Sequence, residues 1–139
     1  MSTPGNAIFH LLKTDATVGP AVLVNGVYKI YPLTGYLEDE PPFITYQSIS
    51  ENANRTKSAD AGPDVITMQI NVVHTDYASA RALAQAVRAA LDLKSGTING
   101  AQIQYISYQS QRDMWEDNAR LNGVAMIAQD YTIRFLNAN

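Results

Sequence analysis

The stretch from Val65 to Leu93 constrains the fold of this chain more than any other part of the sequence. Apolar and polar residues alternate from Val65 to His74, the pattern of a β-strand with one buried and one wet face. Asp76 is a suitable N-cap. The apolar residues from Tyr77 to Leu93 recur every three or four positions, as in an amphipathic helix. Seven alanines in this helix favour its formation and let it approach a sheet closely. The sequence therefore predicts a strand that leads directly into a helix packed on its sheet.

Shorter patterns predict the remaining elements. Asn25-Gly26 between two β-prone runs is typical of a hairpin, and Gly19-Pro20 is expected to close the segment that contains the first helix. We expect a helix over residues 6–15, strands over 27–31, 43–50, 101–110 and 123–135, and polar loops over 51–63 and 111–122. Consecutive strands joined by loops favour antiparallel pairing. We therefore expect one domain over residues 1–139 of the α+β class, in which a mainly antiparallel β-sheet has two helices packed on one face.

The sheet face opposite the helices is expected to be polar but uncharged. Thr67, Gln69 and Asn71 alternate with the apolar residues of their strand and so point to this face. Such side chains can hydrogen-bond to water or to a neighbouring chain. The face would therefore suit a subunit interface as well as solvent.

Composition excludes several classes of chemistry. The 139 residues include no cysteine and two histidines, so disulfides, thiolate metal sites and cysteine nucleophiles are impossible, and we expect no metal and no cofactor. The net charge of −3 argues against sequence-independent binding of nucleic acid. The N-terminal residues lack the pattern of a signal peptide, and the apolar runs are too short to span a membrane. We expect a soluble protein of a reducing, cytoplasmic compartment.

Two groups of residues could be taken as catalytic. His74 and Asp76 are close in sequence, but a histidine between a strand and a helix is typical of a surface or capping residue, and no strained nucleophile turn accompanies it. Glu38, Asp39 and Glu40 could bind a cation or supply a general acid. Their spacing fits no EF-hand, however, and a solvated acidic loop or a contact with a neighbouring basic surface also explains them. With no glycine-rich phosphate loop either, we expect no enzymatic activity.

Two expected loops carry mixed charges and form, with the acidic loop, a candidate protein interface. The first loop holds Arg55, Lys57, Asp60 and Asp64. The second holds Arg112, Asp113, Trp115, Glu116, Asp117 and Arg120. Tryptophan and arginine often anchor interfaces, and mixed charges suit the electrostatic register between subunits. The alternative is that both loops are merely solvated and that the tryptophan folds back on the core.

Four stretches, taken in order, form a pattern with a known counterpart. They are Tyr28-Lys-Ile-Tyr-Pro32, Pro42-Phe-Ile-Thr-Tyr-Gln-Ser-Ile-Ser50, the strand-to-helix segment over 68–91, and Gln129-Asp-Tyr-Thr-Ile-Arg-Phe135. Their order and spacing resemble the tail completion, or tail terminator, family of tailed bacteriophages and phage-like gene transfer particles. One departure is Val73, where members of that family often have tryptophan at a structural position.

The resemblance implies a structural protein of the virion tail or neck that is assembled in the host bacterial cytoplasm. Its subunits would form a homo-oligomeric ring, usually a hexamer, at the head-proximal end of the tail tube. The ring would stop polymerisation of the tube protein and offer a surface to the head connector or head-closure protein, while DNA only passes through its channel. Neither catalysis nor a membrane is implied. A closed ring needs two different patches of one chain, which the polar sheet face and exposed strand edges could supply.

Two other functions remain open at this stage. The chain could be another neck component, such as a head-closure or adaptor protein. It could also be a small ligand-binding or enzymatic α+β domain whose pocket is lined by Tyr46, Tyr105, Tyr108 and Tyr131, although tyrosines on strands usually serve sheet packing.

Overall fold

The computed structural model of the chain describes residues 4–32, 42–52, 63–98, 100–116 and 124–136. The described residues form three helices, α1 (Pro4–Thr14), α2 (Val18–Val22) and α3 (Tyr77–Leu91). They also form eight strands, which are β1 (Leu23–Val24), β2 (Val27–Tyr28), β3 (Ile30–Pro32), β4 (Phe43–Asn52), β5 (Pro63–His74), β6 (Gly96–Ile98), β7 (Ala101–Glu116) and β8 (Val124–Leu136).

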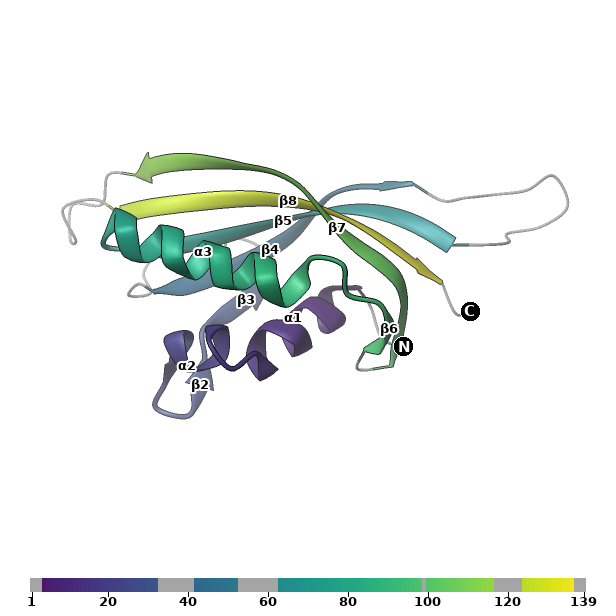
Figure 1. Cartoon of the computed structure of the whole chain (residues 1–139), viewed down its shortest axis with the longest axis horizontal. Coiled ribbons are helices and arrows are strands. Elements are labelled where there is room, and N and C mark those ends of the chain that lie inside the picture. The colour runs from purple at the N-terminus through teal and green to yellow at the C-terminus, as the bar shows by residue number, and fades with distance from the viewer. Residues whose placement is uncertain (1–3, 33–41, 53–62, 99, 117–123, 137–139) are drawn as a thin grey trace, which may run out of the picture.

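Six of these strands form one sheet in the order β3-β4-β5-β8-β7-β6, and β1 and β2 form a separate hairpin. Neighbouring strands of the sheet pair antiparallel, except that β3 runs parallel to β4. Helix α3 lies against β5, β7 and β8, and α1 and α2 pack against α3 on the same side of the sheet (Figure 1). The predicted α+β class with a mainly antiparallel sheet is confirmed, and the helical layer gains α2, which no sequence pattern indicated.

The junction of β5 and α3 forms as predicted. Alternate residues of β5 are buried on the helix side, namely Ile66, Met68, Ile70 and Val72. The carboxylate of Asp76 accepts a hydrogen bond from the backbone N–H of Ser79 at 2.9 Å and so caps α3. Bonds from Ser79 lower the pKa of Asp76 because they favour its ionised form. The helix buries small side chains such as Ala80 and Ala84, which lets its backbone approach the sheet.

A buried glutamine joins α3 to the middle of the sheet. The side chain of Gln129 on β8 is fully buried, and its amide nitrogen donates to the carbonyl oxygen of Ala84 at 2.9 Å and to Oε1 of Gln111 on β7 at 2.8 Å. Its Oε1 accepts the hydroxyl of Tyr131 at 2.7 Å. Buried polar groups are tolerated when they are hydrogen-bonded in this way. The network therefore fixes the position of α3 over β7 and β8.

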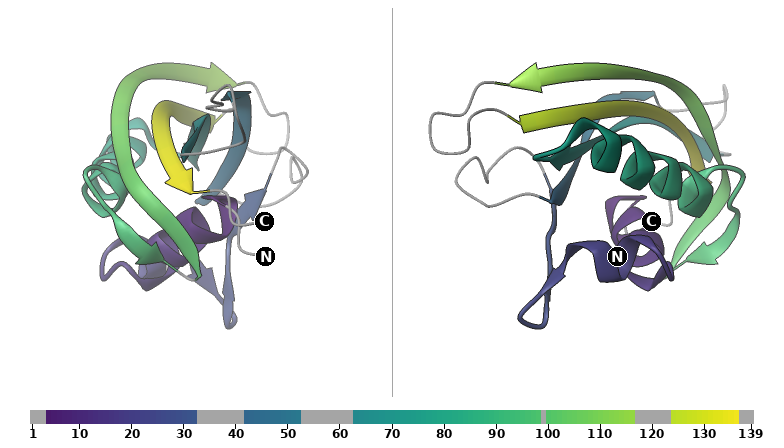
Figure 2. Two further views of the ribbon diagram at one scale, coloured as in Figure 1. Left: turned by 90° about the vertical axis from the view of Figure 1, so that its right-hand side faces the viewer. Right: turned by 60° about the vertical axis from the view of Figure 1, so that its left-hand side comes forward.

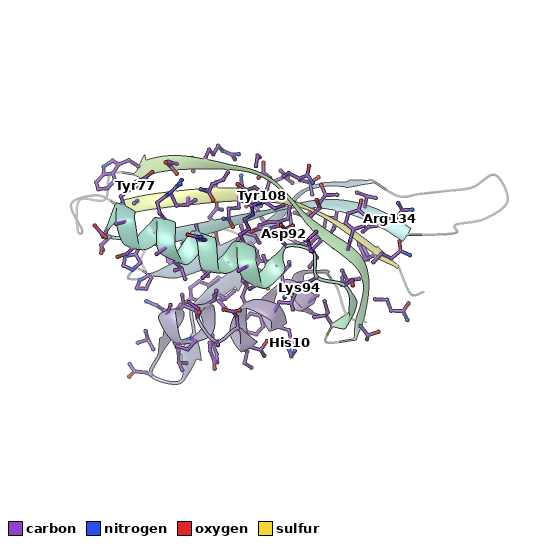
Figure 3. All side chains as sticks on the ribbon, in the orientation of Figure 1. His10, Tyr77, Asp92, Lys94, Tyr108 and Arg134 are labelled. Carbon is purple, nitrogen blue, oxygen red and sulfur yellow. The ribbon has the colours of Figure 1, made fainter. Side chains whose placement is uncertain are left out.

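A second group of contacts holds the C-terminal end of α3. The ring of Tyr131 meets that of Tyr108 edge to face with centroids 5.7 Å apart, and the guanidinium of Arg88 lies 3.9 Å from the centroid of the Tyr108 ring. The carboxylate of Asp92 accepts the backbone N–H of Tyr108 at 3.0 Å (Figure 3). Burial, reinforced by Asp92, raises the pKa of Tyr131 far above its usual range. The hydroxyl thus stays protonated and keeps donating to the glutamine network.

Gly19 and Pro20 lie inside α2 and do not end the first helix, which stops at Thr14. The carboxylate of Asp15 accepts the backbone N–H groups of Thr17 and Val18, each at 2.9 Å, and α2 begins there, before the pair is reached. Proline fits the first turn of a helix because its missing N–H needs no partner there. A Cβ atom at Gly19 would overlap the carbonyl oxygen of Lys13, so glycine permits the close turn. The expectation that this pair closes the segment was wrong.

The expected polar loops are partly strand. β7 continues to Glu116, so the first half of the loop expected over 111–122 is paired with β8. Likewise, β4 reaches Asn52 and β5 begins at Pro63. Polar side chains do not prevent pairing when a neighbouring strand offers backbone partners and one face stays wet. The strand expected over 27–31 is divided into β2 and β3, because β3 leaves the hairpin to pair with β4.

The sheet curls over the helices (Figure 2). The pairing register shifts between Ser48 and Ser50 in β4, and twice in β7, between Ile103 and Tyr105 and between Tyr108 and Ser110. Such bulges bend a strand and increase its twist. They allow β7 to start beside β6 and to end near the first turn of α3.

Replacing Ala84 by leucine tests the close approach of α3. The larger side chain has no space at this buried position, and we expect Ala84→Leu to lower the free energy of unfolding by about 1–3 kcal/mol. Ala89 is exposed on the same helix, so Ala89→Leu should change it by less than about 0.5 kcal/mol. Urea unfolding of both variants measures the difference, and equal midpoints would contradict the packing.

Replacing Gln129 by leucine tests the buried network. The hydroxyl of Tyr131 would lose its acceptor in a closed core, and we expect a loss of about 1–3 kcal/mol in the free energy of unfolding. Gln85→Leu, on the exposed side of α3, is the matched control. If the two variants unfold at the same urea concentration, the network does not hold the helix.

Candidate protein–protein interface

The outer end of β7 carries the described side chains of the interface predicted from the sequence. Asp113 pairs with Ile127 of β8, whose side chain is buried on the helix side, and Arg112 pairs with Ala128. Because successive residues of a strand point to opposite faces, Asp113 and Trp115 belong to the helix side and Arg112 to the other. The structure therefore divides the predicted residues between the two faces of one strand.

On the helix side, Asp113 links β7 to the first turn of α3. Its Oδ2 accepts the hydroxyl of Tyr77 at 2.6 Å, and its Oδ1 lies 3.4 Å from Nη1 of Arg81. The hydrogen bond to Asp113 raises the pKa of Tyr77, because ionisation would place a second negative charge beside the carboxylate. Tyr77 lies at the end of the sheet where β7 stops (Figure 3). The side chains of Arg81 and Asp113 are 49% and 43% exposed, so this cluster adds little stability and is accessible to another molecule.

On the opposite face, Arg112 meets Asp130 of β8. The two side chains approach to 3.4 Å, and Ser110 also donates to Asp130. Oδ1 of Asp130 and Nε of Arg134 are buried without a hydrogen-bond partner within the described part of the chain. The expectation of an uncharged face was therefore wrong. It rested on β5 alone, and β7 and β8 add the charges to the same face.

Polar pairs nevertheless join neighbouring strands on this face. The amide of Asn71 donates to Oγ1 of Thr45 at 3.2 Å, and that of Gln47 donates to Oε1 of Gln69 at 3.0 Å. These cross-strand bonds connect β4 to β5. The face combines neutral amides on β4 and β5 with charged side chains on β7 and β8.

Trp115 does not fold back on the core. Its side chain is 59% exposed, and the neighbouring Met114 is 41% exposed on the other face of the strand. Tryptophan, methionine and arginine are among the residue types enriched in protein interfaces. The end of β7 thus exposes Asp113 and Trp115 on the helix side, near Arg81 of α3, and Arg112 and Met114 on the opposite face. We call these five residues together the β7-end surface (Arg81, Arg112, Asp113, Met114 and Trp115).

The other predicted interface residues are not brought into this surface by any described contact. Asp64 and Glu116 belong to β5 and β7 by their backbone. The remaining candidates, Glu38, Asp39, Glu40, Arg55, Lys57, Asp60, Asp117 and Arg120, lie outside the described residues. Their assignment to an interface stays a prediction.

The structure adds an exposed apolar hairpin that sequence reasoning did not treat as a candidate. Leu23, Val24 and Val27 of β1 and β2 are 41%, 45% and 56% exposed. The turn between the strands has positive φ angles at Asn25 and Gly26, 52° and 80°, as a tight hairpin requires. The Asn-Gly pair between apolar residues was the available signal. It predicted the turn, but not that the hairpin would project from the helical layer (Figure 2).

Of the residues that could suggest catalysis, His74 and Asp76 have structural partners. Nδ1 of His74 accepts the backbone N–H of Thr75, and the carboxylate of Asp76 caps α3. Burial lowers the pKa of His74, partly opposed by Asp76. Tyr131 is packed inside the core against Tyr108, as expected for sheet packing. Across the described ranges, no group of three or more histidine or acidic residues could hold a metal ion, and no helix is long and apolar enough to cross a membrane.

Comparison with known proteins decides which family these features belong to. The sequence model of the family described as tail completion protein gp17 matches residues 6–133, which is nearly the whole chain. The chain belongs to this family. The resemblance found in the sequence is thereby confirmed, and the departure at Val73 falls at a buried position, as expected of a structural one. No curated protein matches the chain at a significant level.

A solved structure has a similar fold. It is a chain described as part of the virion of a native gene transfer agent particle, with a TM-score of 0.65 and 19% sequence identity, and the match covers 95% of this chain and 93% of that one. At this identity the likeness concerns the fold.

Replacing Asp113 by asparagine tests the link between β7 and α3. Without the carboxylate, the pKa of Tyr77 should fall back toward its ordinary value of about 10, because its ionised form no longer faces a negative charge. NMR titration of the Tyr77 ring measures the change. Asp130→Asn removes a carboxylate from the opposite face and should leave the pKa of Tyr77 unchanged. An unaltered titration in Asp113→Asn would show that the two side chains do not meet.

Proposed function

We propose that this chain is a structural tail component that forms a homo-oligomeric ring on the head-proximal end of a tail tube. The ring stops polymerisation of the tube and provides the surface to which the head is joined. Membership of the tail completion family carries this proposal. The likeness in fold to a chain of a gene transfer agent virion supports it. Such a role needs surfaces that bind other subunits and needs no reaction at any side chain.

The described surfaces are suited to that role. A ring of identical subunits needs two different patches on each chain, and a ring between tube and head needs further contacts at its two ends. Trp115 and the arginines of the β7-end surface are of the types that most often anchor protein interfaces. The exposed ion pair of Arg81 and Asp113 can set the orientation of a partner. The hairpin of β1 and β2 offers a separate apolar contact.

Electron microscopy of particles assembled with and without this chain tests the proposed function. If the chain caps the tube, its removal should give tails of uncontrolled length that are separate from filled heads. Tails of normal length that fail to join heads would instead indicate an adaptor or head-closure role. Normal, infectious particles would exclude a role in assembly and would direct attention to a ligand-binding function.

Replacing Trp115 by alanine tests the β7-end surface. Because the side chain is exposed, the free energy of unfolding should change by less than about 0.5 kcal/mol. Loss of an interface anchor costs about 2 kcal/mol or more, so the variant should fail to complete tails when it replaces the wild-type chain. Gln85→Ala, on the exposed side of α3, should restore normal particles. Normal particles with Trp115→Ala would remove this residue from the interface.

A further inference from the structure

Among the residues that the structure describes, the outer part of β7 has no neighbouring strand on one side and forms an open edge of the sheet. β6 pairs only with Ala101–Ile103 of β7. Beyond it, Ile106 forms backbone hydrogen bonds with Leu93 and Lys94, which follow α3. The N–H of Tyr108 is bonded to Asp92. From there to Glu116, β7 has β8 on one side and no described strand on the other. Such an edge presents unpaired backbone groups to another strand.

The opposite edge of the sheet is open along the end of β4. β3 pairs only with Ile44–Tyr46. From Gln47 to Asn52, β4 has β5 on one side and no described strand on the other. The two open segments therefore belong to opposite edges of the sheet, and they lie toward its opposite ends (Figure 1).

The two open segments are only partly protected as strand edges: β4 has a bulge between Ser48 and Ser50, and β7 carries the charged residues Arg112 and Asp113. Natural edges are often blocked by lysine or proline, and neither occurs in residues 47–52 or 109–116. Large apolar side chains are exposed there instead, Ile49 at 48%, Met114 at 41% and Trp115 at 59%. From Ser110 to Glu116, β7 pairs with β8 in unbroken register, so this segment is regular enough to accept another strand.

The directions of the two edges suit pairing between copies of this chain. The strands β4, β5, β8 and β7 alternate in direction, so β4 and β7 of one chain run antiparallel. A second copy that places its β4 beside β7 in the same orientation continues the alternation, and antiparallel pairing is the more stable kind. We propose that the open edge of β7 pairs antiparallel with the open edge of β4 in a second copy, which makes a head-to-tail interface. This inference rests on the proposed ring and assigns its subunit contact.

The pairing registers of the strands also define how far two neighbouring copies must be shifted relative to each other along the strand direction. Gln47, Gln69, Asp130 and Ser110 lie at one level across the sheet. The open part of β7 extends in one direction from this level and the open part of β4 in the other. Full overlap therefore needs a shift of about six residues, or about 20 Å, along the strands. That shift brings Met114 opposite Ser50 of the neighbour, next to Ile49, which has no partner in the β4–β5 register.

A displacement of this kind is compatible with a closed ring. The four central strands are together about 19 Å wide, so a shift of similar size per copy corresponds to strands tilted by about 45° from the ring axis, close to the tilt of closed barrels. Subunits that pair through two different edges form a closed assembly only as a ring. Subunits that pair through the same edge form a dimer.

Cysteine cross-linking tests the contact, and the absence of cysteine from the chain makes each introduced thiol unique. Met114→Cys and Ile49→Cys are purified separately, mixed at assembly concentration and oxidised. Ser110→Cys and Gln47→Cys extend the test to neighbouring registers. We expect disulfide-linked dimers in the mixtures of a β7 variant with a β4 variant, and higher multimers when both cysteines are on one chain. Gln85→Cys, on the exposed side of α3, should give no cross-link with either.

Two results would overturn the proposal. Cross-linking of Met114→Cys with itself alone would indicate a two-fold contact between β7 edges. Absence of cross-links in every mixture, under conditions where the wild-type chain forms oligomers, would mean that the ring uses another surface.

Met114→Lys separates this inference from the proposed function. A lysine on the open edge should abolish oligomers while the unfolding midpoint stays that of the wild type, and Ala89→Lys on α3 should leave both unchanged. If particles made with Met114→Lys still have completed tails, the edge contact is wrong and the proposed function stands. If particles without the chain are normal, the proposed function itself fails.

Discussion

The hydrogen bond between the buried amide of Gln129 and the backbone carbonyl of Ala84 is the contact on which the arrangement of this protein depends. It forms only because an alanine face lets α3 come within bonding distance of the sheet. The same glutamine binds Gln111 of β7 and accepts the hydroxyl of Tyr131. One side chain thus ties the helix to two adjacent strands. Because unsatisfied polar groups in a core are costly, this network permits few alternative positions of α3.

The part of β7 that lies beyond this hydrogen-bond network carries the candidate contact surface. Beyond Gln111, β7 continues along β8 with no described strand on its other side. Asp113 reaches back to Tyr77 and Arg81 at the start of α3, while Arg112 is held by Asp130 on the opposite face. The exposed end of β7 is therefore supported on both faces, although one edge is open. An exposed, partly apolar strand end is suited to binding other virion components, in keeping with membership of the tail completion family.

Sequence reasoning succeeded where a local pattern had one structural solution. The alternation in β5, the Asp76 cap and the helical period of α3 are set by neighbouring residues, and so is the Asn25-Gly26 turn. Sequence reasoning failed where the conformation of a segment depends on residues that are distant in the sequence. Residues 111–116 look like a loop by composition, but β8 supplies their backbone partners. Trp115 was left open between core and surface, and the course of β7 makes it exposed. Gly19-Pro20 lies in α2, which begins at Val18, where the carboxylate of Asp15 accepts the backbone N–H groups of Thr17 and Val18.

The sequence by itself determined the fold class, the family pattern and the main strand-to-helix unit, because periodicity and capping act over a few residues. The tertiary structure decided which strands lie at the edges of the sheet and which residues share a face. Asp130 and Arg112 are 18 residues apart, yet they meet because β7 and β8 pair antiparallel. Likewise, the backbone edges of β4 near Ile49 and of β7 near Met114 have no described neighbour because β3 and β6 are too short to reach them. Such facts depend on the length and register of neighbouring strands, which no local pattern contains.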